Sequence, residues 1–395
     1  MSDRIYYTDP SRTRFEAVVV ETVLVGDRPA VVLDTTAFYP TSGGQPFDTG
    51  TLGDARVTEV LESESGAVLH VVDRAFTPGA RVEGRIDWAR RFDHMQQHTG
   101  QHILSAALDK LSGARTVGFH LGADVSTVDL SIPLSEEAIA AAESEANRVV
   151  WEDRPVGIRF VDAAEASALP LRKEPDREGT LRVIDVEGYD LSACGGTHVA
   201  RTGAIGLVAV LSSERLRGGT RLEFVCGGRA LRALRTYRDA VAGCIRHVSV
   251  APQELPAAVE RLQSESKEQG KAMKDLLQRL AGFEAGALAA RAEDVGGRRQ
   301  VIEAIDGQDQ NGLKAMALAI CATPGFQVAL FSTTRPAVAV VARSKDVALD
   351  AAAVLKALMG EFGGRGGGRA DVAQGGGLTG ETGAVLARAR ELMVA

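Results

Sequence analysis

The sequence predicts a mixed α+β protein built from several domains. The chain has 395 residues, which is more than one ordinary domain holds. Its composition, with 45% hydrophobic and 25% charged residues, is typical of a soluble globular chain. Strand-like segments come first, and strands and helices then follow in mixed order, which favours α+β over a regular parallel wound sheet. We therefore expect four parts, at residues 1–90, 91–248, 249–292 and 293–395.

Residues 1–90 are expected to form a small β-barrel. Short runs rich in Val, Thr and Ile, such as FEAVVVETVLV and ARVEGRID, are divided by Gly, Pro and Asp turns. A glycine motif, Ala37 to Gly50 (AFYPTSGGQPFDTG), interrupts these runs. His70 lies inside one run and is interpreted as an ordinary strand residue.

Residues 91–248 are expected to form an α+β domain that begins with a helix. HMQQHTGQHILSAALDKL has helical periodicity, Asp93 can cap its start, and Gly113 stands just beyond its end. Strands and helices alternate irregularly after it, and RALRALRTYRDAVAGCIRHV predicts a closing helix.

Residues 249–292 predict a helical linker, either a helical hairpin or a coiled coil, because apolar residues from Leu255 to Phe283 recur at steps of four and three. Such a segment either spaces two domains or pairs two chains, so a homodimer through the linker or the C-terminal domain is one expectation. Residues 293–395 predict a third mixed domain. Its glycine tract, FGGRGGGRADVAQGGG, is interpreted as a binding loop that presents Arg365 and Arg369.

The sequence also limits the compartment and the kind of partner. No apolar run reaches the roughly 20 residues of a membrane span, and the N-terminus lacks the order of a signal peptide, so we expect a cytoplasmic protein without a membrane partner. A formal charge of −7 gives no global basic surface. A nucleic acid would have to bind locally, and the candidates near the first helix are Arg85, Arg90 and Arg91.

Three of the seven histidines, at positions 94, 98 and 102, lie four residues apart in one predicted helix. Two histidines at this spacing can bind one ion, because they project from one helix face on adjacent turns. Three cannot, since His94 and His102 are separated by about 12 Å along the helix axis. We favour His98 and His102, because His94 is expected in the fraying first turn.

A second half-site, Cys194-Gly-Gly-Thr-His198, follows about ninety residues later. Two glycines allow a tight turn that can aim the cysteine and the histidine at one point. Together the four side chains supply three nitrogens and one sulfur, which suits tetrahedral Zn²⁺.

These motifs resemble a known family. HTGQH followed by ILSAAL, and ACGGTH, are similar to the editing domain of alanyl-tRNA synthetase and of its free-standing relatives, the AlaX-type editing proteins. The glycine motif resembles part of the N-terminal barrel of the family, and GGRGGGRADVAQGGG resembles its C-terminal DHHA1 domain. The short stretch before His98 leaves no room for an aminoacylation domain, so the chain resembles a long free-standing editor.

The resemblance implies an ATP-independent, zinc-dependent hydrolase that clears chiefly serine, and sometimes glycine, from mischarged alanine tRNA. It implies a pocket that binds the serine hydroxyl, and the candidate residues are Thr41, Ser42, Gln45, Thr116 and His120. The family often has glutamine where His120 stands, which leaves its role as a general base open. Arg365 and Arg369 would grip the tRNA elbow, while the first-helix arginines would hold the acceptor end.

Two alternatives remain open at this point. In the first, zinc only stabilises the fold and the chain is a tRNA-binding adaptor without catalytic activity. In the second, the chain is a DHH-type phosphoesterase, which ranks last because Asp93-His94-Met95 is its nearest approach to an Asp-His-His motif. Four protein ligands also leave open whether zinc is catalytic or structural.

Overall fold

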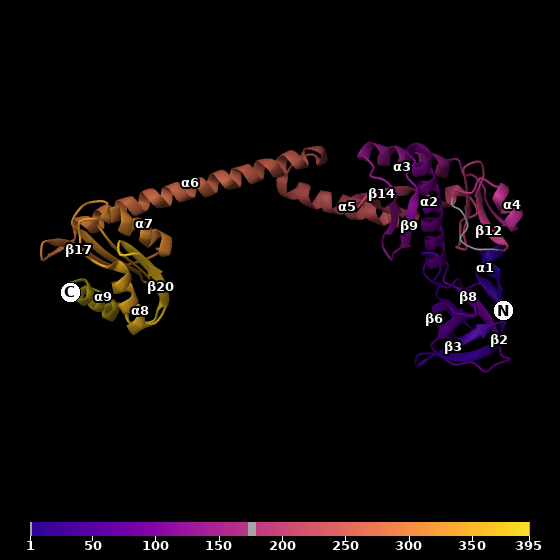
Figure 1. Cartoon of the computed structure of the whole chain (residues 1–395), viewed down its shortest axis with the longest axis horizontal. Coiled ribbons are helices and arrows are strands. Elements are labelled where there is room, and N and C mark those ends of the chain that lie inside the picture. Colours follow the sequence, from indigo (N-terminus) through magenta and orange to yellow (C-terminus); the bar gives the residue numbers. More distant parts are fainter. Residues whose placement is uncertain (1, 173–178, 395) are drawn as a thin grey trace. The chain divides into compact units, whose positions relative to one another are not determined.

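The mixed α+β prediction is confirmed by the computed structural model, which describes residues 2–172 and 179–394. The chain divides into two compact units, Met1–Gly243 and Cys244–Ala395. Figure 1 labels the elements of each unit. Among the described residues, no helix has both the length and the apolar character needed to span a membrane.

The predicted barrel is present as six strands that close in the order β2-β3-β7-β6-β5-β8. Their bounds are Arg14–Val25, Arg28–Leu33, Val68–Val72, Ala55–Glu62, Gly50–Leu52 and Arg81–Ile86. Alternate strand residues point inward, so that side chains such as Phe15, Leu33 and Val60 fill the interior, and Phe38 of the glycine motif packs among them. His70 is a buried strand residue that bonds Thr36 and the Val31 carbonyl.

The first long helix, α2 (Trp88–Ser112), begins five residues earlier than its predicted cap at Asp93. Asp87 is the cap, and its side chain accepts a hydrogen bond from the Arg90 amide. The sequence offers two aspartates before the histidines, and the one that directly follows β8 is used. His94 is therefore buried in the second turn, and its predicted place in a fraying first turn is wrong.

Two sheets complete the first unit beside α2 and α3 (Glu136–Trp151). One is antiparallel, β14-β15-β10-β9, and the other is β11-β12-β13. Leu104, Leu108, Val149 and Phe224 are among the residues that bury α2 and α3 against the first sheet. The strands are β9 (Thr116–Leu121), β10 (Ser126–Leu130), β11 (Val156–Val161), β12 (Leu181–Val186), β13 (Asp190–Ala193), β14 (Val208–Leu216) and β15 (Gly219–Cys226).

The second unit has a six-stranded sheet with helices on both faces. Its order is β16-β17-β18-β19-β21-β20, and α8 (Ala351–Phe362) and α9 (Thr382–Val394) pack on one face. The other face is covered by α7 (Gln310–Cys321) and the end of α6 (Leu255–Ala290). The remaining bounds are β16 (Glu293–Val295), β17 (Arg298–Ile305), β18 (Phe326–Ser332), β19 (Ala337–Arg343), β20 (Arg365–Gly368) and β21 (Val372–Leu378).

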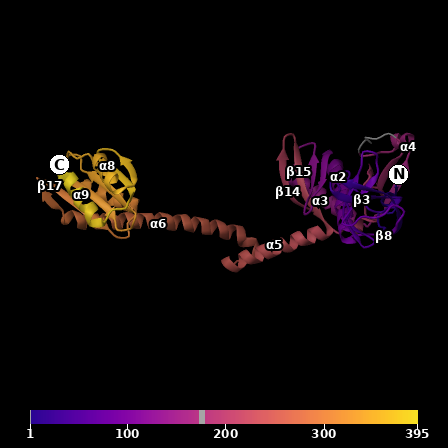
Figure 2. The ribbon, with the colours of Figure 1, turned by 90° about the horizontal axis from the view of Figure 1, so that it is seen from below.

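Two features of this unit bear on the sequence predictions. The glycine tract is a hairpin of β20 and β21 and not a loop, because its glycines allow the two strands to approach closely. The linker helix α6 is one uninterrupted helix in both views (Figure 1 and Figure 2). Several of its apolar residues, such as Leu262, Leu276 and Phe283, are exposed. That they pair two chains stays a prediction.

A buried ion pair joins α2 to the barrel. The Arg91 guanidinium is fully buried and bonds the Asp48 carboxylate of the glycine motif. It also donates to the carbonyls of Pro10, at 2.7 Å, and Ala37, at 2.6 Å. These contacts satisfy a charge that would otherwise be costly to bury. They fix the start of α2 against the loop that contains the glycine motif.

We expect Asp48→Asn to destabilise the first unit by about 3–5 kcal/mol, because the substitution leaves the buried charge of Arg91 uncompensated. Urea unfolding monitored by Trp fluorescence measures the change. Asp73→Asn is the matched control, since Asp73 forms its ion pair with Arg56 at the surface. Equal losses in the two variants would contradict this assignment.

Candidate metal centre and its cavity

The four predicted ligands come together in the first unit. One ligand atom from each of His98, His102, Cys194 and His198 lies within 4.8 Å of the others. Cys194 Sγ is 3.4 Å from Nε2 of His98 and 3.4 Å from Nε2 of His198. Bond lengths of 2.3 Å to sulfur and 2.1 Å to nitrogen in a tetrahedral zinc site give a separation of about 3.6 Å. The donor atoms therefore fit zinc.

Each histidine is held at its other ring nitrogen. His98 Nδ1 lies 2.9 Å from Gln45 Oε1, and His102 Nδ1 lies 3.3 Å from Asp190 Oδ2. His198 Nδ1 lies 3.2 Å from the Thr99 hydroxyl. An amide or carboxylate oxygen only accepts, so Nδ1 of His98 and His102 carries the proton. The lone pair of Nε2 then faces Cys194, as in metal sites whose histidines are oriented by neighbouring groups.

The electrostatics also suit a metal ligand set. Burial raises the pKa of Cys194, but the surrounding histidines outweigh burial and hold this pKa well below its usual value. A lowered pKa favours the thiolate, which is the form that binds metal. Burial lowers the pKa of His198 to about 3, so its imidazole is neutral. Burial also lowers the pKa of His102, but the hydrogen bonds with Asp190 and Cys194 outweigh it and raise this pKa to about 9, so a metal ion would have to displace a proton from this imidazole.

The loop after β13 can reach α2 because it contains Gly196. A Cβ atom at this position would lie 2.2 Å from Cε1 of His98 and 2.4 Å from its Nδ1. The carbonyls of Cys194 and Gly196 accept hydrogen bonds from Arg182, at 2.6 and 2.9 Å. Gln45 bonds both the amide and the hydroxyl of Thr197. Glycine at 196 is thus required by close approach, and the loop is fixed from two sides.

A cavity of about 1010 Å³ opens beside the ligands. His98 and His102 line it, and Phe119 of β9 packs against His98 with ring centroids 5.3 Å apart. Polar groups on its wall form a chain, in which Gln101 and Thr116 both donate to the Ser105 hydroxyl, at 2.8 and 2.7 Å. Arg172 and Ser192 complete the polar wall and bond Asp190.

Of the predicted substrate contacts, only Thr116 lines this cavity. Thr41 is exposed and lies outside its lining. Gln45 is fully buried and orients His98, so its predicted role as a substrate contact is wrong. His120 is exposed and lies outside the cavity lining, next to Phe119, which contacts His98, and its role stays a prediction. Ser42 forms a bridge to Gln45 that closes the turn.

Sequence reasoning missed several residues of the site. Gln101 and Ser105 follow His98 at helical spacing, so their position on the same side of α2 could have been read from the sequence. Asp190 precedes the Cys-Gly-Gly-Thr-His motif by four residues, and an acidic partner for a ligand histidine was a foreseeable need. Arg172, Ser192 and Phe119 had no comparable signal.

The arginines predicted to bind nucleic acid differ in how exposed they are. Arg91 is buried in its ion pair with Asp48 and cannot reach a phosphate, so that prediction is wrong. Arg90 is half-buried, and it donates to the Phe47 carbonyl with its guanidinium over the Phe47 ring. Arg365 and Arg369 are exposed at the glycine hairpin of the second unit.

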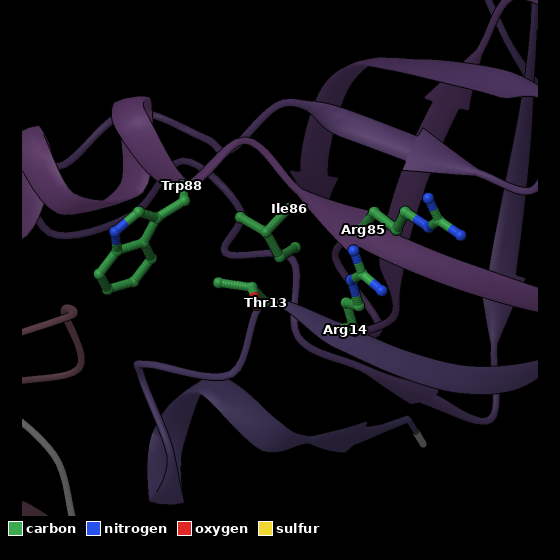
Figure 3. Close-up of a pocket in the computed structure, with 5 residues that line it drawn as sticks. All are labelled: Thr13, Arg14, Arg85, Ile86 and Trp88. Carbon is green, nitrogen blue, oxygen red and sulfur yellow. The ribbon is translucent and has the colours of Figure 1, made fainter.

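Arg85 lies at a pocket of about 510 Å³ on the barrel surface, shown in Figure 3. Arg85 and Arg14 are direct cross-strand partners, and their guanidinium groups lie on one side of the pocket. The Trp88 ring lies on the other side and is 40% exposed. Like charges opposite one another on two strands repel, although Arg85 is partly neutralised by Glu83 at 2.8 Å.

We expect Gly196→Ala to lower zinc affinity roughly 10- to 100-fold, because the added methyl group pushes His98 or the loop out of place. Competition with a chromogenic chelator measures the affinity. Gly195→Ala is the matched control, since a Cβ there meets only the Tyr7 ring, at 3.8 Å. Unchanged affinity in the 196 variant would show that the loop does not need this close approach.

Comparisons with known proteins agree with this geometry. Residues 8–90 match the family of tRNA synthetases class II (A), and residues 181–223 match the threonyl and alanyl tRNA synthetase second additional domain. Residues 297–395 match the DHHA1 domain. The second match contains β12, β13 and the loop with Cys194 and His198.

Similar full-length proteins are alanine--tRNA ligases. One from Natronomonas pharaonis is 38% identical over 95% of this chain and 42% of its own length. One from Pyrococcus abyssi is 34% identical over 94% of this chain and 41% of its own length. The chain thus spans about two fifths of these relatives.

A solved structure is similar as well. The C-Ala domain from Aquifex aeolicus alanyl-tRNA synthetase is 24% identical, with a TM-score of 0.25, over 26% of this chain and 98% of that domain. The three domain matches follow one another in the same chain as the four clustered ligands, and the ligase matches extend over nearly its whole length. The chain is an AlaX-like relative of alanyl-tRNA synthetase.

Proposed function

We propose that this chain hydrolyses the ester that joins a wrong amino acid, chiefly serine and sometimes glycine, to the 3′ end of alanine tRNA. The observation that carries the proposal is the ligand cluster of His98, His102, Cys194 and His198, of which the first two line a large cavity. The kinship to alanyl-tRNA synthetase supplies the substrate class. Zinc is the proposed cofactor, because the donor set and its orientation fit this ion.

An aminoacyl ester needs little activation, so the site has to position the ester and stabilise charge that develops on its carbonyl oxygen. Zinc, when bound by the four residues, supplies positive charge at the inner wall of the cavity. The protein residues do the remaining work. Phe119 shields His98, while Gln101 and Thr116, both bonded to Ser105 behind them, present polar groups at which a water or the substrate can be held.

Selectivity for serine over alanine is proposed to come from the chain of hydroxyl and amide groups at Thr116, Ser105 and Gln101. A seryl ester differs from an alanyl ester by one hydroxyl, and a polar wall favours the substrate that completes its hydrogen bonds. Thr116 is the proposed direct contact, because its hydroxyl lies at the cavity surface and bonds Ser105 behind it.

Contacts with tRNA are proposed at two separate surfaces. On the first unit, Arg85 with Arg14 offers positive charge to phosphates, and the exposed Trp88 ring offers a face on which a base can stack. On the second unit, Arg365 and Arg369 extend from the glycine hairpin, where close-packed backbone leaves the side chains free to meet the RNA.

The activity is tested with seryl- and alanyl-tRNA of the alanine isoacceptor. We expect selective loss of the seryl ester at micromolar protein, and a parallel loss of activity and bound zinc in Cys194→Ala. Ester hydrolysis and metal analysis on the same samples measure both quantities. If the seryl ester survives while the tRNA still binds, the chain is a zinc-stabilised adaptor and not a hydrolase.

The role of Thr116 is tested by Thr116→Val. We expect the ratio of kcat/KM for seryl- over alanyl-tRNA to fall roughly tenfold, which corresponds to one lost hydrogen bond. Thr127→Val on the neighbouring strand is the matched control, because Thr127 lies outside the cavity lining. An unchanged ratio in Thr116→Val with full zinc would place serine recognition elsewhere.

A further inference from the structure

A second cavity, of about 440 Å³, lies along α2 before the metal ligands. Its lining includes Arg90, Asp93 and His94 of α2, and Arg229 and Arg232 from the start of α5 (Gly227–Val248). His94 precedes His98 by one helical turn, about 6 Å along the axis. Pro46 also lines this cavity, directly after the Gln45 that orients His98. The two cavities are therefore neighbours on the same helix and the same loop.

His94 is a buried polar group without a partner. His94 is only 3% exposed, and its Nδ1 atom has no hydrogen-bond partner among the described residues. Burial, and then the charge of Arg90, lowers the pKa of His94 to about 4, so the imidazole is neutral at pH 7. A neutral imidazole offers one N–H donor. Nδ1 is enclosed by the protein, so a ligand in the cavity could accept this hydrogen bond only from Nε2.

The charges around His94 favour an anion. Arg229 is 3% exposed, bonds the Asp93 carboxylate at 2.7–3.0 Å and donates to the Gly122 carbonyl at 2.8 Å. Arg90 is fixed by the Phe47 carbonyl at 2.9 Å. Arg232 is exposed and lies 3.9 Å from Asp93. The guanidinium groups of Arg229 and Arg232 thus face the Asp93 carboxylate, and Arg90 lines the same cavity. Arg90 and Arg229 are held in place before any ligand arrives.

We propose that this cavity binds one phosphate of the RNA backbone near the nucleotide whose ester enters the metal-lined cavity. The inference rests on the proposed function, because that function places an RNA 3′ end one helical turn away. Arg90, Arg229 and the His94 N–H would contact the phosphate oxygens, and Arg232 would cover it from the rim. Phosphate contacts of this kind fix the register of a nucleic acid and carry no base preference. Here the register would decide whether the ester reaches His98 and His102.

The experiment uses the zinc-loaded full chain and an RNA hairpin that has an unpaired 3′ tail and carries no amino acid. Each phosphate linkage of the tail is replaced in turn by a neutral methylphosphonate, and affinity is measured by fluorescence anisotropy. In the unaltered protein we expect one linkage to be sensitive, with a loss of roughly tenfold. This sensitivity should disappear in Arg232→Ala and in His94→Phe. In Arg232→Ala, the number of ions released on RNA binding, measured from the dependence of affinity on salt, should fall by about one.

Arg238→Ala is the matched control, because Arg238 is an exposed arginine of the same helix outside the cavity lining. It should keep the sensitive linkage. The proposal is overturned if the unaltered protein shows no sensitive linkage, or if both cavity variants retain it. It is also overturned if inorganic phosphate occupies the cavity at millimolar concentration while no RNA linkage matters, since the cavity would then serve free phosphate.

The two proposals fail in different ways. A sensitive linkage that depends on Arg232, in a protein that leaves seryl-tRNA intact, would support the phosphate cavity and refute the hydrolase. Selective hydrolysis of the seryl ester without any sensitive linkage would support the hydrolase and refute the phosphate cavity.

Discussion

The buried ion pair between Arg91 and Asp48 is the contact on which the arrangement of the first unit depends. Asp48 lies three residues after Gln45 in the glycine motif, and Arg91 lies two turns before His98 on α2. Once the pair is made, the loop and the helix have one relative position, and Gln45 then meets His98 Nδ1. A buried ion pair adds little net stability compared with apolar packing, but its strict geometry specifies a unique arrangement. This is the use that the structure indicates for it.

The metal centre follows from that arrangement through a set of hydrogen bonds. Gln45, Asp190 and Thr99 come from a loop, a strand and a helix, and each holds one Nδ1 atom. The three Nε2 atoms are thereby left to meet Cys194, which Arg182 and the close approach of Gly196 bring into position. The site is thus prepared by groups that do not themselves bind metal, and the chemistry proposed for the cavity depends on these supporting residues as much as on the ligands.

Much of this fold could be predicted because its signals are local. Alternating β-branched residues marked the barrel strands, and the four-residue spacing of the histidines marked the helix that presents them. The errors have physical causes. Arg91 carries a charge, so the sequence suggested a surface role, and only the tertiary fold shows that Asp48 neutralises it in the interior. Gln45 was misassigned because the direction of its side chain depends on contacts with distant segments, here His98 and Thr197.

Gln45 belongs to the loop of the barrel domain that contains the glycine motif, and its carboxamide forms hydrogen bonds with both His98 and Thr197. The barrel is thereby linked to the metal ligands. Any ion that tightens the ligand set must therefore also tighten the barrel, because binding and folding share one free energy. Loss of the metal would therefore destabilise the ligand set and the barrel together, and the lifetime of the folded protein would depend on the supply of metal.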